Sequence, residues 1–124
     1  MQVLVVDDQP DYSRLVARWL RKLGGVVRVE LAASAAEALA LIESMKPDLV
    51  ITDLRMPGMD GFELTRKVKE NALAPVVVLM TSAEPPQFRA RADAAGADYC
   101  VEKDHLQSRL PEFLQKRFGL GLHP

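Results

Sequence analysis

Five polar residues, each placed just after an apolar stretch, have the types and spacing that phosphoryl chemistry on a metal ion requires. These residues are Asp7, Asp8, Asp53, Thr81 and Lys103. The apolar stretches are unbroken or nearly so, which is typical of strands buried on both faces of a parallel sheet. Since the carboxyl ends of parallel strands share one edge, where open α/β sheets bind ligands, we expect the five side chains to meet there.

Three carboxylates at one place repel one another, by about 4 kcal/mol for two charges ~4 Å apart at an effective dielectric constant near 20. A cation must therefore join them, or one of them must be protonated. Lys103 supplies one positive charge. A hard divalent ion, Mg²⁺ or Mn²⁺, suits the remaining charge, because the ligands are all oxygen and no histidine or available thiol is near.

Such a site can transfer a phosphoryl group, because a carboxylate can attack phosphorus and form an aspartyl phosphate. Asp53, which precedes a loop with Pro57-Gly58 and Gly61, is the candidate nucleophile. Lys103 would take up charge on the transferred group, and Thr81 would orient one of its oxygens. Each residue alone also has a plainer interpretation: Asp53 as a turn cap, Thr81 as a strand-end hydroxyl, Lys103 as a solvated lysine. The prediction therefore depends on the five together.

The chain alternates strand and helix five times. The expected strands cover residues 3–6, 26–31, 49–52, 76–80 and 99–101. The expected helices begin at Pro10, at the capping boxes Ser34/Glu37 and Asp60/Glu63, at Pro85, and near Pro111, which is placed in a first turn. They end at Gly24, Pro47, near Glu70, at Gly96 and at Phe118. Right-handed crossovers favour an α/β, flavodoxin-like (βα)5 sandwich with parallel strand order 2-1-3-4-5, and residues 26–31 alternate as an edge strand does.

Apolar residues at helical spacing predict the core-facing sides of the first four helices, most clearly in the first and least clearly in the fourth. In the first helix the stripe is Tyr12, Leu15, Val16, Trp19, Leu20 and Leu23. In the fourth it is only Phe88, Ala92 and Ala95, so that helix is the weaker prediction.

The chain has 124 residues, which fits one domain, expected to span residues 1–119 with 120–124 as a short tail. The net charge of −1 gives no reason to expect binding to nucleic acid or to an anionic membrane. No apolar run approaches the ~20 residues of a membrane span. The single cysteine, Cys100, excludes an internal disulfide and favours a reducing compartment, so a cytoplasmic location is expected.

Four segments resemble the receiver domain of two-component response regulators, the CheY-like family. They are Val5-Val6-Asp7-Asp8, the run from Asp53 to Gly61, Met80-Thr81-Ser82-Ala83, and Gly96-Ala97-Asp98 leading to Lys103. The resemblance implies that Asp53 accepts a phosphoryl group from a phosphohistidine of a sensor histidine kinase or a phosphotransfer protein. It also implies that Asp8, Asp53 and the backbone carbonyl of Arg55 hold Mg²⁺, with Asp7 supporting through water. Such a protein is not a classical enzyme, since it catalyses only its own phosphorylation and dephosphorylation.

By the same resemblance, Lys103 pairs with the phosphoryl group and Thr81 closes onto it. This movement repositions the face formed by the fourth helix, the fifth strand and the fifth helix, which binds a downstream protein target. The resemblance also allows a homodimer. Whether the natural protein ends with this domain or continues into an output domain is left open.

The chain departs from the family pattern at two positions. Three residues before the lysine the family usually has an aromatic switch residue, and here that position is Cys100, with Tyr99 one residue earlier. Because side chains alternate along a strand, Tyr99 is interpreted as a packed core residue facing the other way, unless a small strand shift lets it serve. The lysine is also commonly followed by proline, and Asp104 stands there instead. A redox role for Cys100 is a weaker hypothesis, since Lys103 is its one basic neighbour in sequence.

Three other functions fit these residues less well than that of a phosphoacceptor. A receiver-like docking module that signals without phosphorylation typically lacks one or more of the five residues, which are all present here. A phosphohydrolase would usually carry a second aspartate two residues after the nucleophile, where this chain has Arg55. A Rossmann nucleotide site would need a glycine-rich loop where Asp8-Gln9-Pro10 stands.

Overall fold

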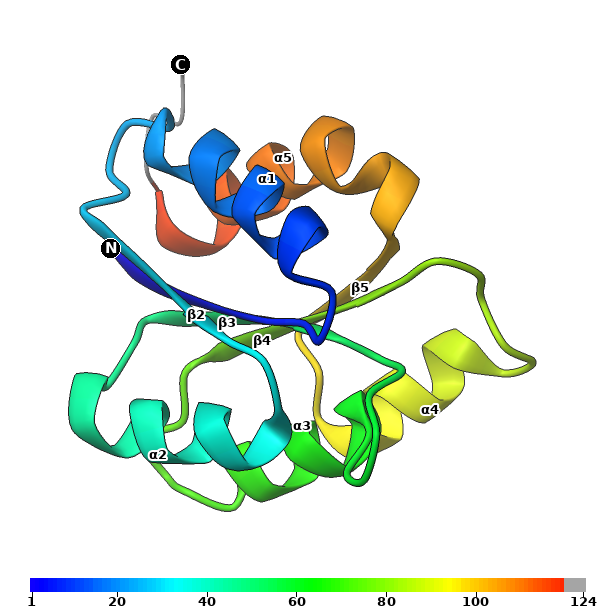
Figure 1. Cartoon of the computed structure of the whole chain (residues 1–124). Coiled ribbons are helices and arrows are strands. Elements are labelled where there is room, and N and C mark those ends of the chain that lie inside the picture. The colour runs from blue at the N-terminus through cyan, green and yellow to red at the C-terminus, as the bar shows by residue number, and fades with distance from the viewer. Residues whose placement is uncertain (120–124) are drawn as a thin grey trace.

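The computed structural model describes residues 1–119 and contains a five-stranded parallel sheet with the predicted order β2-β1-β3-β4-β5 (Figure 1). The strands are β1 (Gln2–Val6), β2 (Arg28–Ala32), β3 (Leu49–Asp53), β4 (Val76–Thr81) and β5 (Tyr99–Glu102). The helices are α1 (Pro10–Arg21), α2 (Ala35–Met45), α3 (Gly61–Lys69), α4 (Phe88–Ala95) and α5 (Leu106–Phe118), with the short 3₁₀ turn η1 (Lys103–His105) before α5. The flavodoxin-like fold is confirmed, and the predicted tail at 120–124 lies outside the described residues. Within residues 1–119 the structure has no helix with the length and apolar character that crossing a membrane requires.

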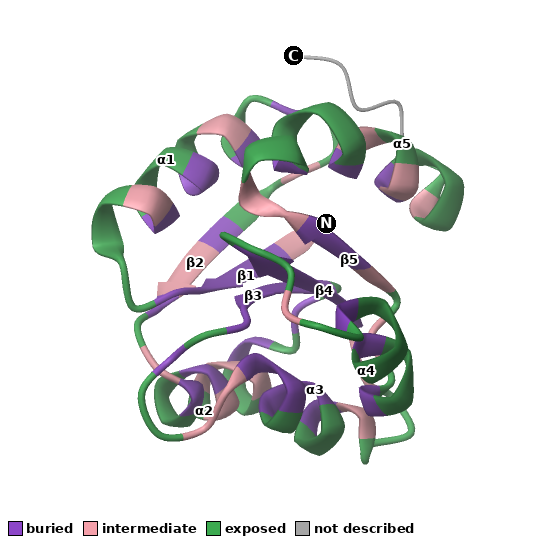
Figure 2. Cartoon of the chain, turned by 90° about the vertical axis from the view of Figure 1, so that its right-hand side faces the viewer, coloured by how far each residue is buried: buried purple, intermediate pink, exposed green. Residues whose placement is uncertain are grey.

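The sheet separates two layers of core because side chains alternate along each strand. Along β1, Val3 and Val5 pack in the core shared with α1 and α5, whereas Leu4 and Val6 pack in the core shared with α2 and α3. Figure 1 shows α1 and α5 on one side of the sheet and α2, α3 and α4 on the other. The strands between them are largely buried, as Figure 2 shows in purple. With both faces covered, the strand ends remain as the place for a ligand.

The starts of α2 and α3 follow their predicted capping boxes. The Ser34 hydroxyl accepts a hydrogen bond from the Glu37 amide at 3.1 Å, and the Asp60 carboxylate accepts one from the Glu63 amide at 2.9 Å. At Gly61 the first turn of α3 approaches the end of β3 so closely that a Cβ atom would lie 2.6 Å from the carbonyl oxygen of Asp53. Glycine therefore allows α3 to begin directly beside the candidate nucleophile.

The prediction for α5 was wrong at its start, because Pro111 lies inside the helix rather than in its first turn. Leu106, Leu110 and Leu114 are at most 1% exposed and form one buried face. Burying such side chains stabilises the fold by about 1.5–3 kcal/mol each. A start at Leu106 puts Leu106 on the same buried face as Leu110 and Leu114, and the burial of the three side chains together outweighs the cost of about 3 kcal/mol for an interior proline.

The start of α4 was also predicted wrongly, since the helix begins at Phe88 and not at Pro85. A proline disfavours helical backbone in the residue before it, so Pro86 excludes Pro85 from the helix. Gln87 then has a left-handed backbone with φ of 59°. From Phe88 onward the predicted buried face of the helix is confirmed.

The buried face of α1 differs from the predicted stripe. Leu15 is 51% exposed, whereas Ser13 and Ala17 are buried together with Val16 and Leu20. Helical spacing predicts that one side of α1 is buried, but it does not fix the centre of that side to within one residue. The small side chains of Ser13 and Ala17 let α1 lie close to the sheet. The prediction that β2 is an edge strand is confirmed.

Candidate functional site

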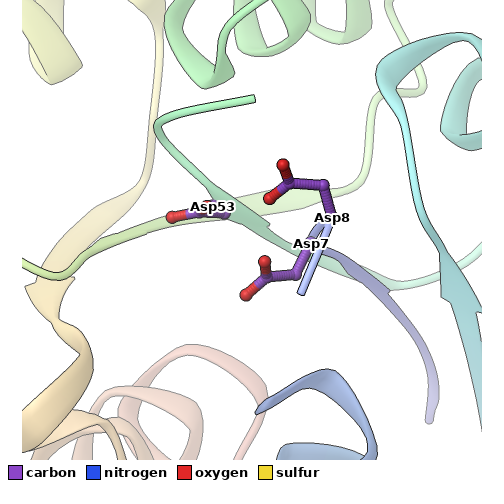
Figure 3. Close-up of side chains that lie close together, drawn as sticks. All are labelled: Asp7, Asp8 and Asp53. Atoms are coloured by element: carbon purple, nitrogen blue, oxygen red, sulfur yellow. The ribbon is translucent and has the colours of Figure 1, made fainter. Parts of the chain in front are cut away.

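Three carboxylates gather at the carboxyl edge of the sheet, as the sequence predicted. Strand β1 pairs with β3 in a register that places Val6 beside Thr52, so the next residues of the two strands, Asp7 and Asp53, are neighbours. One oxygen from each of Asp7, Asp8 and Asp53 lies within 4.8 Å of the others. Figure 3 shows Asp7 and Asp8 leaving the end of β1 beside Asp53 on β3. Asp7 is 2% and Asp53 5% exposed, whereas Asp8 faces the solvent.

Lys103, which follows the edge strand β5, brings a positive charge to these acids. Its Nζ donates to Asp7 Oδ2 at 2.9 Å and lies 3.5 Å from Asp53 Oδ1. The Lys103 side chain is 7% exposed, so both ion pairs are shielded from water. Lys103 follows β5 directly, and its side chain extends past the end of β4 to the acids on β3 and β1.

The environment of Asp53 raises its pKa from 3.8 to about 6. The largest cause is burial, which disfavours the charged form, and the negative charge of Asp7 adds to it. The ammonium of Lys103 acts in the opposite direction and lowers the pKa. Asp53 therefore changes between its protonated and ionised forms near pH 6. Any further cation nearby favours the ionised carboxylate.

The donor set fits a hard divalent cation. Three carboxylates and one ammonium leave a formal charge of −2, all candidate ligand atoms are oxygens, and exposed Asp8 leaves the site accessible. The loop that carries Arg55 is closed by a hydrogen bond from the Gly61 amide to the Leu54 carbonyl at 2.8 Å. That the Arg55 carbonyl is a further ligand stays a prediction.

Thr81 lies at the end of β4, next to the strand that carries Asp53, and is fully buried. Its hydroxyl donates to the carbonyl of Ala83 at 2.9 Å, in the loop that leads to α4. The structure thus brings together the side chains of Asp7, Asp8, Asp53 and Lys103. The hydroxyl of the fifth predicted residue, Thr81, is bonded within its own loop instead.

Tyr99 and Cys100 lie on opposite faces of the sheet, as strand alternation predicts. The Tyr99 ring is half-buried and stacks on Phe113 of α5, with ring centroids 4.7 Å apart. Cys100 is buried on the other face with Phe88 of α4. Arg89 Nη1 lies 3.9 Å from Cys100 Sγ, a basic neighbour that the sequence analysis missed. Burial nevertheless dominates and raises the pKa of the thiol, which opposes reactivity. A switching role for either residue stays a prediction.

Tyr12 and Gln9 also belong to the site, although the sequence analysis gave them no role there. Lys103 Nζ lies 4.4 Å from the centroid of the Tyr12 ring, and the Tyr12 hydroxyl donates to the Lys103 carbonyl at 3.3 Å. The backbone amide of Gln9 donates to Asp7 Oδ1 at 2.9 Å, and the side-chain oxygen Oε1 of Gln9 lies 3.5 Å from Lys103 Nζ. The first turn after β1 therefore contributes contacts to both Asp7 and Lys103.

Comparison with protein families decides the class to which this geometry belongs. The model of the response regulator receiver domain matches residues 3–115. This chain belongs to that family. Among solved structures, it superimposes on the signal receiver domain of NarL from Mycobacterium tuberculosis with a TM-score of 0.84, at 32% identity and 94% coverage of both chains. The chemotaxis protein CheY4 of Vibrio cholerae gives a TM-score of 0.82 at 30% identity, covering 93% of this chain and 96% of that one.

Two curated relatives show the contexts in which similar receiver domains occur. The "Positive alginate biosynthesis regulatory protein" of Pseudomonas aeruginosa is 37% identical over 117 residues, which are 94% of this chain and 46% of the relative. The "Sensor histidine kinase RcsC" of Salmonella typhimurium is 34% identical over 103 residues, which are 83% of this chain and 11% of the relative. The chain thus spans about half of the first relative and about a tenth of the second.

Proposed function

We propose that this receiver domain accepts a phosphoryl group on Asp53 from a phosphohistidine of a sensor histidine kinase or of a phosphotransfer protein. The observation that carries the proposal is the position of Lys103 Nζ, 2.9 Å from Asp7 and 3.5 Å from Asp53, beside a third carboxylate. An acid held ionised by a buried ammonium, with an accessible acidic neighbour, is suited to attack phosphorus. The name of the relative RcsC is consistent with a histidine kinase as donor.

In the proposed step a carboxylate oxygen of Asp53 attacks the phosphorus atom in line. The P–N bond to the imidazole breaks, and its electron pair returns to the ring nitrogen. Lys103 keeps Asp53 ionised before attack and pairs with an oxygen of the transferred group afterwards. Asp7 holds Lys103 in place through both stages, because its 2.9 Å contact is the shorter of the two.

Asp7, Asp8 and Asp53, with the Arg55 carbonyl, are the residues that would hold Mg²⁺, or Mn²⁺ in its place. When bound, the ion neutralises negative charge that develops on the phosphoryl oxygens. The formal charge of −2 on the side chains and the exposure of Asp8 support this assignment.

We further propose that the response begins at Thr81. Its hydroxyl would leave the carbonyl of Ala83, bond the phosphoryl group on Asp53 and draw the loop before α4 with it. The face formed by α4, β5 and α5 would then change and bind a downstream protein target or a second copy of the chain. The stacked rings of Tyr99 and Phe113 line a hollow on this face, together with the charged residues Arg109, Glu112 and Lys116. A cytoplasmic location stays a prediction.

The test is the intact mass of the protein after incubation with acetyl phosphate, with and without Mg²⁺. We expect one phosphoryl group per chain, only with the metal, and none in Asp53→Asn. Asp60→Asn is the matched control, because it removes a nearby carboxylate while the amide can still cap α3. Undiminished labelling of Asp53→Asn would contradict the proposal. No labelling of the wild type by acetyl phosphate or by a phosphorylated kinase would favour the docking module.

A further inference from the structure

Tyr12 contacts both ends of Lys103. Its ring faces the ammonium, with Nζ 4.4 Å from the ring centroid, and its hydroxyl donates a long hydrogen bond of 3.3 Å to the Lys103 carbonyl. The two residues are 91 positions apart: Tyr12 lies in the first turn of α1, and Lys103 is the first residue of η1, directly after β5. A single side chain thus fixes a lysine at its backbone and at its charged end.

The ring completes the surroundings of the ammonium. Asp7, Asp53 and Gln9 place oxygens 2.9, 3.5 and 3.5 Å from Lys103 Nζ. An aromatic face within about 6 Å attracts a cation and keeps water from it. Tyr12 therefore favours the conformation in which the ammonium lies between the two buried acids over one in which it extends into solvent.

The hydrogen bond to the carbonyl acts on the loop that follows. Asp104 and His105 continue from Lys103 in the 3₁₀ turn η1, and both are exposed. Where receiver domains commonly have a proline after the lysine, this chain has Asp104, so the backbone is not stiffened from within. The Tyr12 hydroxyl holds it from across the sheet edge instead.

Tyr12 keeps its proton throughout the ordinary pH range. Burial, and next the negative charges of Asp7, Asp104 and Asp53, raise the pKa of its hydroxyl to about 12. The side chain remains a neutral donor and adds no negative charge to a site that already holds three carboxylates.

We infer that Tyr12 is a positioning residue, which holds Lys103 between Asp7 and Asp53 and thereby sets the rate of phosphoryl transfer to Asp53. The inference rests on the proposed function. The ring contributes most of the effect because it faces the charge, and the hydroxyl steadies the backbone.

The experiment measures the initial rate of labelling by acetyl phosphate with Mg²⁺ for Tyr12→Leu and Tyr12→Phe, each alone and with Lys103→Ala. We expect Tyr12→Leu to slow labelling by about three- to thirtyfold, the range for loss of a shielded cation–π contact. Tyr12→Phe keeps the ring and should stay within about threefold of the wild type, because only one long hydrogen bond is lost. In the Lys103→Ala background, Tyr12→Leu should have no further effect. In parallel, lysine side-chain NMR should show the Lys103 methylene protons shifted upfield in the wild type and in Tyr12→Phe, and not in Tyr12→Leu.

Trp19→Leu is the matched control, since Trp19 is a half-buried ring on the same helix that packs in the core. It should lower stability without slowing labelling. A Tyr12→Leu rate equal to the wild-type rate, or a further loss from Tyr12→Leu in the Lys103→Ala background, would overturn the inference while leaving the phosphoacceptor function intact. An unlabelled wild type would mark failure of the proposed function, and the inference would fall with it.

Discussion

The carboxyl edge of the sheet has two halves that differ in how their polar groups are bonded. Around β1 and β3, Lys103 lies between Asp7 and Asp53 at 2.9 and 3.5 Å, beneath the ring of Tyr12. Around β4 and β5, the Thr81 hydroxyl is bonded to its own loop, at Ala83. We call the first the acid half and the second the response half.

The difference shows which part of the site is preformed. The acid half already has its charges in contact, so on our proposal it needs only a donor and a metal. The response half must exchange one hydrogen bond for another, because the Thr81 hydroxyl donates elsewhere. It also lacks an aromatic residue at Cys100, which is buried beside Phe88. We therefore expect changes in the acid half to slow or abolish phosphorylation and changes in the response half to uncouple it from output.

Lys103→Ala should have the largest effect, because it breaks the acid half. Removing one partner of a buried ion pair leaves uncompensated charges on Asp7 and Asp53, and we expect a loss of about 2–4 kcal/mol in the free energy of unfolding without metal. Saturating Mg²⁺ should restore part of this, since the carboxylates remain. Labelling by acetyl phosphate should slow by about 100-fold or more. Urea unfolding and intact mass measure the two effects.

The control for Lys103→Ala is Lys116→Ala. The Lys116–Glu112 pair has a comparable distance of 3.1 Å, but its side chains are 77% and 73% exposed. Its loss should change the free energy of unfolding by less than about 1 kcal/mol. Equal losses for the two variants would show that the Lys103 pairs add nothing beyond a surface contact.

Asp53→Asn should stabilise the metal-free protein while it abolishes labelling. The pKa of Asp53 is raised to about 6 in the folded protein, mainly by burial, so ionising it opposes folding. A rise from 3.8 to about 6, at about 1.4 kcal/mol per pKa unit, means that the variant should gain about 3 kcal/mol above pH 6. The advantage should shrink as the pH falls from about 6 to about 4, because the wild-type carboxyl then binds a proton that the unfolded chain still lacks. Urea unfolding in chelator across this range gives the answer, and a gain that grows as the pH falls would contradict the account.

Thr81→Val should have the smallest effect on stability. It should have the clearest effect on the coupling between phosphorylation of Asp53 and the change in the face formed by α4, β5 and α5. Valine keeps the shape and loses the hydrogen bond to the carbonyl of Ala83, an exposed residue, so we expect a change of at most about 1 kcal/mol. Labelling of Asp53 should stay within about threefold of the wild-type rate. The amide NMR shifts that phosphorylation produces in α4 and β5 should be lost in Thr81→Val and kept in Thr81→Ser. Unaltered shifts in the valine variant would place the response elsewhere.

The fold and the shared position of the acidic residues could be predicted from the sequence, because both follow from local patterns along the chain. Apolar runs such as residues 76–80 marked the buried strands, and the common carboxyl edge of a parallel sheet then placed Asp7 and Asp53 together. Helix starts were less accurate, since Pro111 is tolerated inside α5 where three leucines are buried. Tertiary packing decided that boundary, and no local signal reports it.

The missed contacts depend on geometry that spacing does not encode. Tyr12 lies on a helix with clear apolar spacing, so it was predicted as a core residue, and its partner Lys103 lies 91 positions away. The hydroxyl of Thr81 was expected at the site, but side-chain rotation directs it to Ala83. The departure from proline at Asp104 was noted from the sequence, but the contact of Tyr12 with Lys103 did not follow from it.

The central claim, that Asp53 receives the phosphoryl group, is tested most directly by locating the label. Borohydride reduces an aspartyl phosphate to homoserine, which marks the modified position in a peptide digest. The account predicts homoserine at position 53 alone, after treatment with acetyl phosphate and Mg²⁺. Homoserine at position 7 or 8, or a phosphorylated chain with no reducible aspartate, would contradict it.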